Sequence, residues 1–377
     1  MTQAALSAAN LRRAESPGLW VLAWRRFCHD RVGLVSFAIA LFFFGLMTAS
    51  GLGLIAGDWS REVGVNYAPP TFIGADNVAR APAATAPAVS NSPPTEIKGE
   101  SNIVDPLADA LSEIRQPKRA GTSDTDIADP LADVLTEIRK GAGGASASAT
   151  LAPTLSFGGD KWGRDVLKKA IKGTETSMFV GLAAAVLTAF LGTVFGALAG
   201  YYGRWVDDFF NWFYSIFTSI PYLLLILSIA AVLNQKGTMT VVLILGLTGW
   251  TGIFRLVRGE YLKHKVREYI QAADAIGASH MRRMFVHILP NVSHVVLVQL
   301  SLHVVLFIKS EVVLSFLGFG VGVDTVSWGS MLNEAQNELI LGKWWQLVAA
   351  TIAMAALVTA FSLFTDALRD ALDPKLK

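Results

Sequence analysis

Residues 32–57 read VGLVSFAIALFFFGLMTASGLGLIAG, a stretch without a charged residue. A helix needs about 20 apolar residues to cross the hydrocarbon core of a bilayer. This stretch is long enough to do so, exceeds the apolar core of a signal peptide and lacks a convincing small-residue cleavage site. The sequence therefore predicts an uncleaved first transmembrane helix over residues 32–57.

Five further stretches are long and apolar enough to span the membrane. Pro221 interrupts one of them, which a span tolerates where neighbouring helices satisfy the freed carbonyl. The composition agrees, since 52% of the residues are hydrophobic and only 16% are charged. We predict an all-α integral membrane protein with six transmembrane helices. The five further spans are residues 176–201, 209–233, 239–256, 292–316 and 345–368.

Basic residues near the span ends predict the orientation, because Lys and Arg in short loops resist translocation. The short loops on one side carry only Lys236 and Lys343, so we expect the opposite side, with both termini, in the cytoplasm. Lys168, Lys169 and Lys172 do not fit this orientation, because they lie on the predicted outer side, just before the second span. We interpret residues 162–173 as an interfacial amphipathic segment. The basic residues of the predicted cytoplasmic side are Arg12, Arg13, Arg25, Arg26, Arg31, Arg204, Arg255, Arg258, Lys263, Lys265, Arg267, Arg282, Arg283, Arg369, Lys375 and Lys377.

A long segment, residues 58–157, follows the first span on the predicted outer side. Residues 67–94 are mostly Ala, Pro, Ser, Thr and Asn, a composition that buries too little apolar surface to fold and predicts disorder. The sequence DPLADALSEIR at 105–115 recurs as DPLADVLTEIR at 129–139. Each copy predicts a short amphipathic helix that begins with an Asp cap and a Pro. We interpret the pair either as a docking element for an external partner or as a duplication in a tolerant loop.

The cytoplasmic loop, residues 258–290, reads RGEYLKHKVREYIQAADAIGASHMRRMFVHILP and predicts two short helices. Gly277 can take the left-handed position that ends the first helix, and Ser279 can cap the second. Pro290 then stops or redirects the chain at the membrane. Spacings of i, i+3, i+4 and i+7 give each helix one small or apolar face. These faces are Tyr269, Ala272, Ala273 and Ile276 in the first helix and Met281, Met284, Phe285 and Ile288 in the second.

Two interpretations of this loop fit the periodicity. Small residues such as Ala272 and Ala273 allow close approach to a partner groove, so the pair can transmit force to or from another subunit. A surface helix pair without a partner has the same spacing.

A resemblance to a known family favours the first interpretation. The loop resembles the "EAA" loop of ABC importer permeases in three elements, namely Gln271-Ala272-Ala273, Gly277 and Leu289-Pro290. In that family the loop docks into the ATP-binding subunit as a coupling helix, so the resemblance implies an ATPase-coupling loop here. Gln271 stands where the family usually has Glu, so a salt bridge from this position is not carried over.

Four further segments resemble the DppC/OppC subunits of the dipeptide and oligopeptide permeases. They are residues 158–167 (GGDKWGRDVL), 314–320 (LSFLGFG), 327–332 (SWGSML) and 368–374 (LRDALDP). The resemblance implies a type I ABC importer permease fold, with a cytoplasmic arm (1–31), the first span (32–57), a partly disordered periplasmic insert (58–157) and a permease core (158–377).

This resemblance also implies a location, a function and a set of partners. We expect a multi-pass protein of the bacterial inner membrane that translocates dipeptides, oligopeptides or similar small solutes. Nickel and opine importers share these motifs, so those solutes stay open. The implied partners are a homologous second permease, two ATP-binding subunits, an external solute-binding protein and membrane lipid.

Several chemistries are not expected of this chain. The sequence contains no Gly-x-x-x-x-Gly-Lys-Ser/Thr phosphate cradle, so we expect partner subunits to use ATP. The six histidines form no H-E-x-x-H pair, and Cys28 is the only cysteine, which we interpret as an incidental thiol. A net charge of +2 without a basic stripe argues against nucleic acid. We expect neither catalysis, nor a metal, nor a cofactor in this chain.

Two rival classes need features that the sequence barely offers. An ion-coupled secondary transporter needs a carboxylate or a broken helix near the bilayer midplane, and only Pro221 hints at one. An intramembrane enzyme needs a nucleophile and a base within the spans, and no such set is visible.

A few polar residues of the spans remain to be assigned. Gln299 and His303 lie one turn apart, and we interpret them as lining a solute path or bridging helices. Glu311, which Lys309 does not face, is interpreted as interhelical or cavity-lining. We expect a solvated polar turn at Asp207 and Asp208.

Overall fold

The computed structural model describes residues 24–74, 151–322 and 324–372. Both repeat copies, at 105–115 and 129–139, lie outside the described residues, as do residues 75–94 of the low-complexity tract. Contacts divide the chain into one unit of Met1–Ala75 with Ala152–Lys377 and a second unit of Asp76–Leu151. The fold below is that of the first unit.

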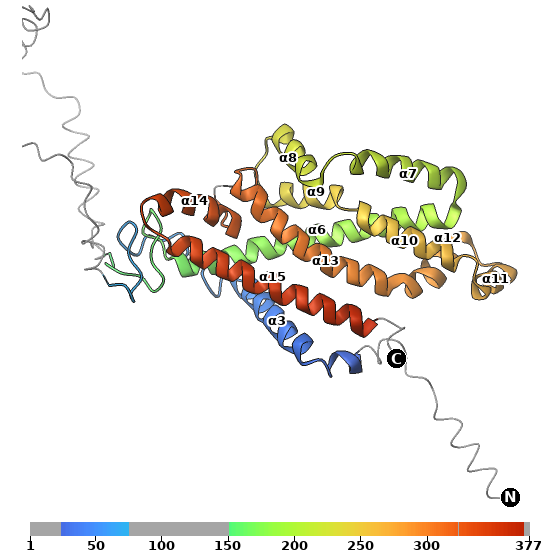
Figure 1. Ribbon diagram of the computed structural model, residues 1–377, viewed down its shortest axis with the longest axis horizontal. Coiled ribbons are helices and arrows are strands. Elements are labelled where there is room, and N and C mark those ends of the chain that lie inside the picture. Colours follow the sequence, from blue (N-terminus) through green and yellow to red (C-terminus); the bar gives the residue numbers. More distant parts are fainter. Residues whose placement is uncertain (1–23, 75–150, 323, 373–377) are drawn as a thin grey trace, which may run out of the picture. The chain divides into compact units, whose positions relative to one another are not determined.

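Helices make up the regular structure of the described residues (Figure 1). Five of them, or five runs of them, are long and apolar enough to cross a membrane, and a sixth span results if the bent pair α7–α8 is counted as one. The predicted all-α membrane fold is thus confirmed for this part of the chain. The elements are α3 (Arg31–Gly51), α6 (Val166–Tyr202), α7 (Arg204–Thr218), α8 (Tyr222–Leu233), α9 (Thr238–Thr248), α10 (Thr251–His264), α11 (Glu268–Ala275), α12 (His280–Arg282), the π-helical turn η2 (Arg283–Ile288), α13 (Leu289–Phe316), α14 (Trp328–Ile340) and α15 (Trp345–Leu372).

Helix α6 is the axis of the bundle. Its 37 residues extend over about 55 Å, well beyond a hydrocarbon core of about 30 Å. At one end Trp328 Nε1 donates to the carbonyl of Ala170, and at the other Tyr201 Oη hydrogen bonds to His280 Nδ1. We call these the α14 end and the α11 end, and Figure 1 shows them at opposite ends of the bundle.

The second predicted span is wrong at its start. Residues 162–173 do not form a separate interfacial segment, because α6 already begins at Val166. The side chain of Asp165 caps this helix by accepting from the backbone N–H groups of Leu167 and Lys168. The basic residues at 168–172 therefore lie in the first turns of α6.

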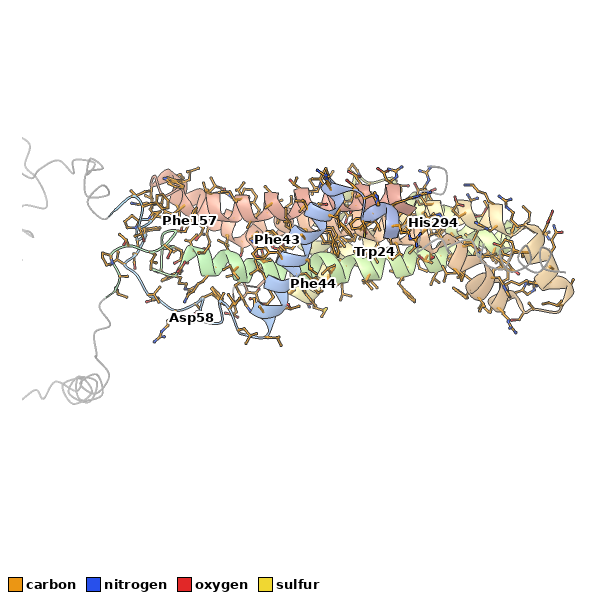
Figure 2. The ribbon with its side chains drawn as sticks, turned by 90° about the horizontal axis from the view of Figure 1, so that it is seen from below. Trp24, Phe43, Phe44, Asp58, Phe157 and His294 are labelled. Carbon is orange, nitrogen blue, oxygen red and sulfur yellow. The ribbon has the colours of Figure 1, made fainter. Side chains whose placement is uncertain are left out.

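The first predicted span is too long. Helix α3 ends at Gly51 rather than at residue 57, and Gly53 in the following turn has φ +72°. This left-handed conformation suits glycine and takes the chain out of the helix. Phe43 and Phe44 are neighbours in α3 but lie on different faces of the helix (Figure 2). Phe43 is buried and contacts the Trp328 ring, whereas Phe44 is exposed.

The third predicted span is broken at Pro221 into α7 and α8, which are bent by 83°. Pro221 has φ −54° and ψ 130°, an extended rather than a helical conformation. Proline also disfavours the helical region at the residue before it, so the chain turns here instead of kinking within one helix.

Pro290, by contrast, does not stop the chain. The helical run continues from His280 to Phe316, with Pro290 in the first turn of α13. In a regular helix its ring would clash with the carbonyl four residues earlier. The wider π-helical turn η2, immediately before α13, accommodates the proline and keeps the run continuous.

A glycine stripe on α6 allows close packing against α10. A Cβ atom at Gly192 would lie 2.7 Å from Ile253 Cβ, and one at Gly196 or Gly200 would lie 2.8 Å or 2.7 Å from a backbone carbonyl of α10. Small residues four apart are the usual means of bringing membrane helices together. The spacing is visible in the sequence, but we did not predict this contact from it.

The glycine stripe gives a first testable prediction. Gly196→Ala places a methyl group against the carbonyl of Phe254, and we expect it to lower the free energy of unfolding by about 1–3 kcal/mol. Gly259→Ala, in α10, is the matched control, because a Cβ there has no neighbour within 4 Å. Thermal unfolding of both purified variants measures the difference, and equal stability would contradict the packing role.

Candidate functional site

The helix pair of the 258–290 loop stands at the α11 end on a packed base. Ile270 of α11 is buried in one cluster with Met284, Ile288 and Tyr261, and Ala273 of the same helix is also buried. The Tyr261 hydroxyl also donates to the carbonyl of Met284 at 3.1 Å. Because side chains of α10, α11 and η2 interlock here, the pair moves with α10 rather than as a loose loop.

The connection between the two helices has the predicted geometry. Gly277 has φ +82°, and the Ser279 side chain accepts from the backbone N–H of Arg282. An ion pair between Arg283 and Asp274 joins η2 to α11. The angle between the helices is thus set by a glycine conformation, a cap and a charge pair.

The predicted small-residue face of α11 is divided between two surroundings. Ala273 faces inward, whereas Tyr269, Ala272 and Ile276 are exposed, with Ile276 83% exposed. The prediction placed all four on one contact face, but the buried side of α11 runs through Ile270 and Ala273. We call Tyr269, Ala272 and Ile276 the exposed α11 surface.

The other residues proposed for this loop lie around that surface. Gln271 is exposed, and its side-chain amide donates to the carbonyl of Val266 at 3.2 Å. Leu289 is half-buried and Pro290 exposed, both within the continuous helical run. Neither of these two lies on α11, so their position in the structure gives them no shared surface with Ile276.

The polar residues of the fifth span make contacts both within α13 and to α6. Glu311 is fully buried and accepts hydrogen bonds from Ser177 Oγ on α6 and from Ser315 Oγ, each at 2.7 Å. His303 Nδ1 donates to the backbone carbonyl of Gln299 at 2.7 Å. Of the two interpretations of Glu311, the contacts favour an interhelical role.

The expectation of a solvated turn at Asp207 is wrong. Helix α7 begins at Arg204, so Asp207 lies in its first turn, where the carboxylate accepts from Arg258 Nη2 at 2.7 Å. Asn211 Nδ2 donates to the same side chain. The ion pair between Asp207 and Arg258 connects α7 to α10. Because the two residues are 51 positions apart, no local sequence pattern predicts this contact.

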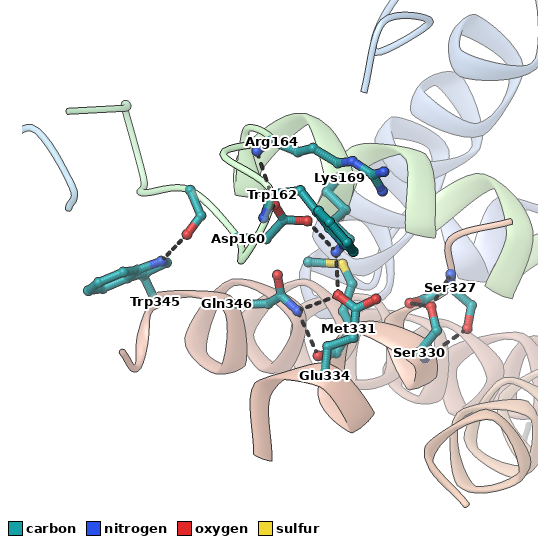
Figure 3. A network of polar contacts seen from close by, with 11 residues as sticks. Asp160, Trp162, Arg164, Lys169, Ser327, Ser330, Met331, Glu334, Trp345 and Gln346 are labelled. Carbon is teal, nitrogen blue, oxygen red and sulfur yellow. Dashed lines mark hydrogen bonds and ion pairs between the residues drawn. The ribbon is translucent and has the colours of Figure 1, made fainter. Parts of the chain in front are cut away.

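A second group of polar side chains lies at the α14 end (Figure 3). Lys169 is buried, and its ammonium group lies 2.8 Å from Asp160 Oδ2 and 2.5 Å from Glu334 Oε2. Asp160 also accepts from the backbone N–H groups of Trp162 and Arg164. We call Asp160, Lys169 and Glu334 the Lys169 cluster. It joins the start of α6 to α14, and we did not predict it.

Comparisons with known proteins identify the family. Residues 192–377 match the family described as binding-protein-dependent transport system inner membrane component. The chain is 37% identical to the dipeptide transport system permease protein DppC of Bacillus subtilis over 221 residues. The aligned region covers 59% of this chain and 69% of that protein. The chain belongs to this permease family. Other permeases of the family are similar at comparable length.

Two of these relatives are the oligopeptide permease OppC of Bacillus subtilis and the glutathione permease GsiD of Pectobacterium atrosepticum. They are 36% and 34% identical, each over 59% of this chain, and 72% and 73% of their own lengths are covered. As a member of this family, the chain is a multi-pass permease subunit of an ABC importer. It works with other subunits of that importer. The exposed α11 surface lies inside the family match, whereas Asp160 and Lys169 precede it.

Lys169 and its neighbour Lys168 give a second prediction. Lys169→Met leaves Asp160 buried without its cation, and we expect a loss of about 3–5 kcal/mol in the free energy of unfolding. Lys168→Met is the matched control, because Lys168 pairs with Asp58 at the surface and such pairs contribute less than about 1 kcal/mol. Thermal denaturation of the two permease variants tests this, and equal losses would contradict it.

Glu338 of α14 gives a prediction for pH. Burial raises its pKa to about 7, Lys169 opposes this shift, and Asp160 and Glu334 add to it. Since the pKa is raised above its usual 4.5, the folded permease binds more protons between about pH 4.5 and 7. Its stability therefore falls as pH rises through that window.

Glu338→Gln should remove this fall in the free energy of unfolding, which amounts to up to about 3 kcal/mol. Above pH 7 the variant should therefore be more stable than the parent permease. Unfolding midpoints from pH 5 to 8 measure both profiles. Parallel profiles would show that Glu338 is not the titrating group.

Proposed function

We propose that this permease subunit translocates dipeptides, oligopeptides or similar peptide-class solutes, and that its exposed α11 surface docks into an ATP-binding subunit. The observation that carries the docking proposal is an exposed apolar tip, Ile276, on a helix whose opposite face is buried. Similar proteins named as dipeptide, oligopeptide and glutathione permeases support a peptide rather than nickel or an opine.

The proposed orientation puts the α11 end and both termini in the cytoplasm. Five cations at the end of α10, between it and α11, and in α12 and η2 gather at the α11 end: Lys263, Lys265, Arg267, Arg282 and Arg283. Cations near span ends favour the cytoplasmic side. Lys169 is one of the basic residues that argue against this orientation. Its charge is neutralised inside the Lys169 cluster.

Force would pass from the docking surface into the membrane through rigid contacts. Movement of α11 would be transmitted by Ile270 to Tyr261 of α10, since these two side chains share one buried cluster. The glycine stripe then carries α10 and α6 together. A closing pair of ATP-binding subunits would thus move the spans as a body between inward-facing and outward-facing states, as alternating access requires.

The partners follow from this arrangement. One chain offers one docking surface, so a homologous second permease would supply the other for a pair of ATP-binding subunits. ATP chemistry belongs to those subunits, and an external binding protein would deliver the solute at the α14 end.

The test compares two exposed isoleucines. Ile276→Glu places a charge on the proposed docking surface and should lower ATP-driven uptake into proteoliposomes at least tenfold, with less ATP-binding subunit co-purified. Ile340→Glu is the matched control, because Ile340 is 84% exposed against 83% for Ile276 but lies in α14. We expect the ATP-binding subunit to co-purify with this variant as it does with the parent protein.

Normal uptake and normal subunit association in Ile276→Glu would sink the docking proposal. Ala273→Glu is unsuitable for this test, because Ala273 is buried and the variant would disturb the helix pair itself. Uptake driven by an ion gradient without any ATP-binding subunit would contradict the ATP-driven mechanism.

A further inference from the structure

A recess of about 350 Å³ opens at the α14 end, beside the Lys169 cluster. Its walls come from helices α6, α13 and α14 and from four connections between helices: the segment after α3, the segment before α6, the α8–α9 turn and the α13–α14 segment. Four cationic side chains line it, Lys161, Arg164, Lys169 and Lys236, against the single carboxylate of Glu334. The recess therefore carries an excess of positive charge.

Most of this charge has no neutralising ion pair among the described residues. Lys169 is buried, and Asp160 and Glu334 hold its ammonium group, so it forms a closed inner wall. Lys161 and Lys236 are exposed, and neither has a carboxylate partner among the described residues. The free positive charge thus lies at the rim.

Arg164 is held in the recess in a way that leaves a hydrogen-bond donor unused. Its guanidinium group lies 5.5 Å from the ring centre of Trp59 and 5.9 Å from that of Trp162. Stacking of this kind fixes the plane of the guanidinium. Its Nε atom is buried and has no acceptor among the described residues. A buried donor without a partner calls for an acceptor from outside.

We propose that this recess receives a carboxylate side chain of the external solute-binding protein. This inference rests on the proposed function, which requires such a partner at the α14 end. A carboxylate matches the guanidinium group of Arg164 and the two lysines of the recess, Lys161 and Lys236, in charge. Charges at a rim orient and accelerate protein association, which suits a partner that must dock and leave in every cycle.

A carboxylate of the transported solute fits the site less well. Lys169 at the inner wall of the recess is already paired with its two carboxylates, so it offers a solute carboxylate no free charge further in. A docked protein side chain needs no such charge.

The experiment uses the whole transporter, with its ATP-binding subunits, in nanodiscs. In a Lys161→Glu/Lys236→Glu double variant, the affinity for the solute-binding protein should fall about tenfold at low salt, and the difference should shrink at high salt. Lys343→Glu is the matched control, a lysine of the same end that does not line the recess, with an expected change below about twofold. Basal ATP hydrolysis should stay at the parent level in both.

A photo-crosslinking residue in place of Trp162, which is 49% exposed at the recess, identifies what enters it. Adducts with an acidic peptide of the solute-binding protein support the proposal. Unchanged affinity in the double variant, or reduced uptake at unchanged affinity, overturns it and leaves the proposed function intact. Failure of the parent protein to associate with ATP-binding subunits would instead count against the proposed function.

Discussion

The close approach of α6 and α10 is the contact on which the other parts of this permease depend. Three glycines spaced four residues apart let the α6 backbone meet the carbonyls of α10. Lipid gives membrane helices no hydrophobic reason to associate, so backbone-to-backbone packing must hold them. On one side of this contact α10 carries Tyr261 and the α11 base, and on the other α6 carries the Lys169 cluster.

Polar side chains at the two ends of α6 do different work. At the α14 end, buried charges connect segments that are far apart in sequence, with Lys169 and Glu334 separated by 165 residues. At the α11 end the ion pair between Arg283 and Asp274 and the hydrogen bond between Tyr201 and His280 leave an apolar tip exposed. The contacts at the α14 end therefore fix the arrangement of its segments, whereas the α11 end exposes an apolar surface.

The predicted coupling loop illustrates where residue patterns stop being sufficient. Helical spacing placed Ala272 and Ala273 on one face, and the turn at Gly277 and the cap at Ser279 followed from local chemistry. Which alanine faces out depends on the position of Tyr261 and Met284, which belong to other elements. Periodicity defines a stripe on a helix, but only the neighbours decide which edge of that stripe they cover.

The sequence by itself determined the membrane class, most of the spans and the likeness to peptide permeases, because span length, apolar composition and glycine or serine capping are local properties. The tertiary structure alone decided that Asp207 pairs with Arg258 and that the helix runs through Pro290. Each of these depends on groups that come together only on folding, since ion pairs across 51 residues and a π-helical turn before a proline leave no periodic trace.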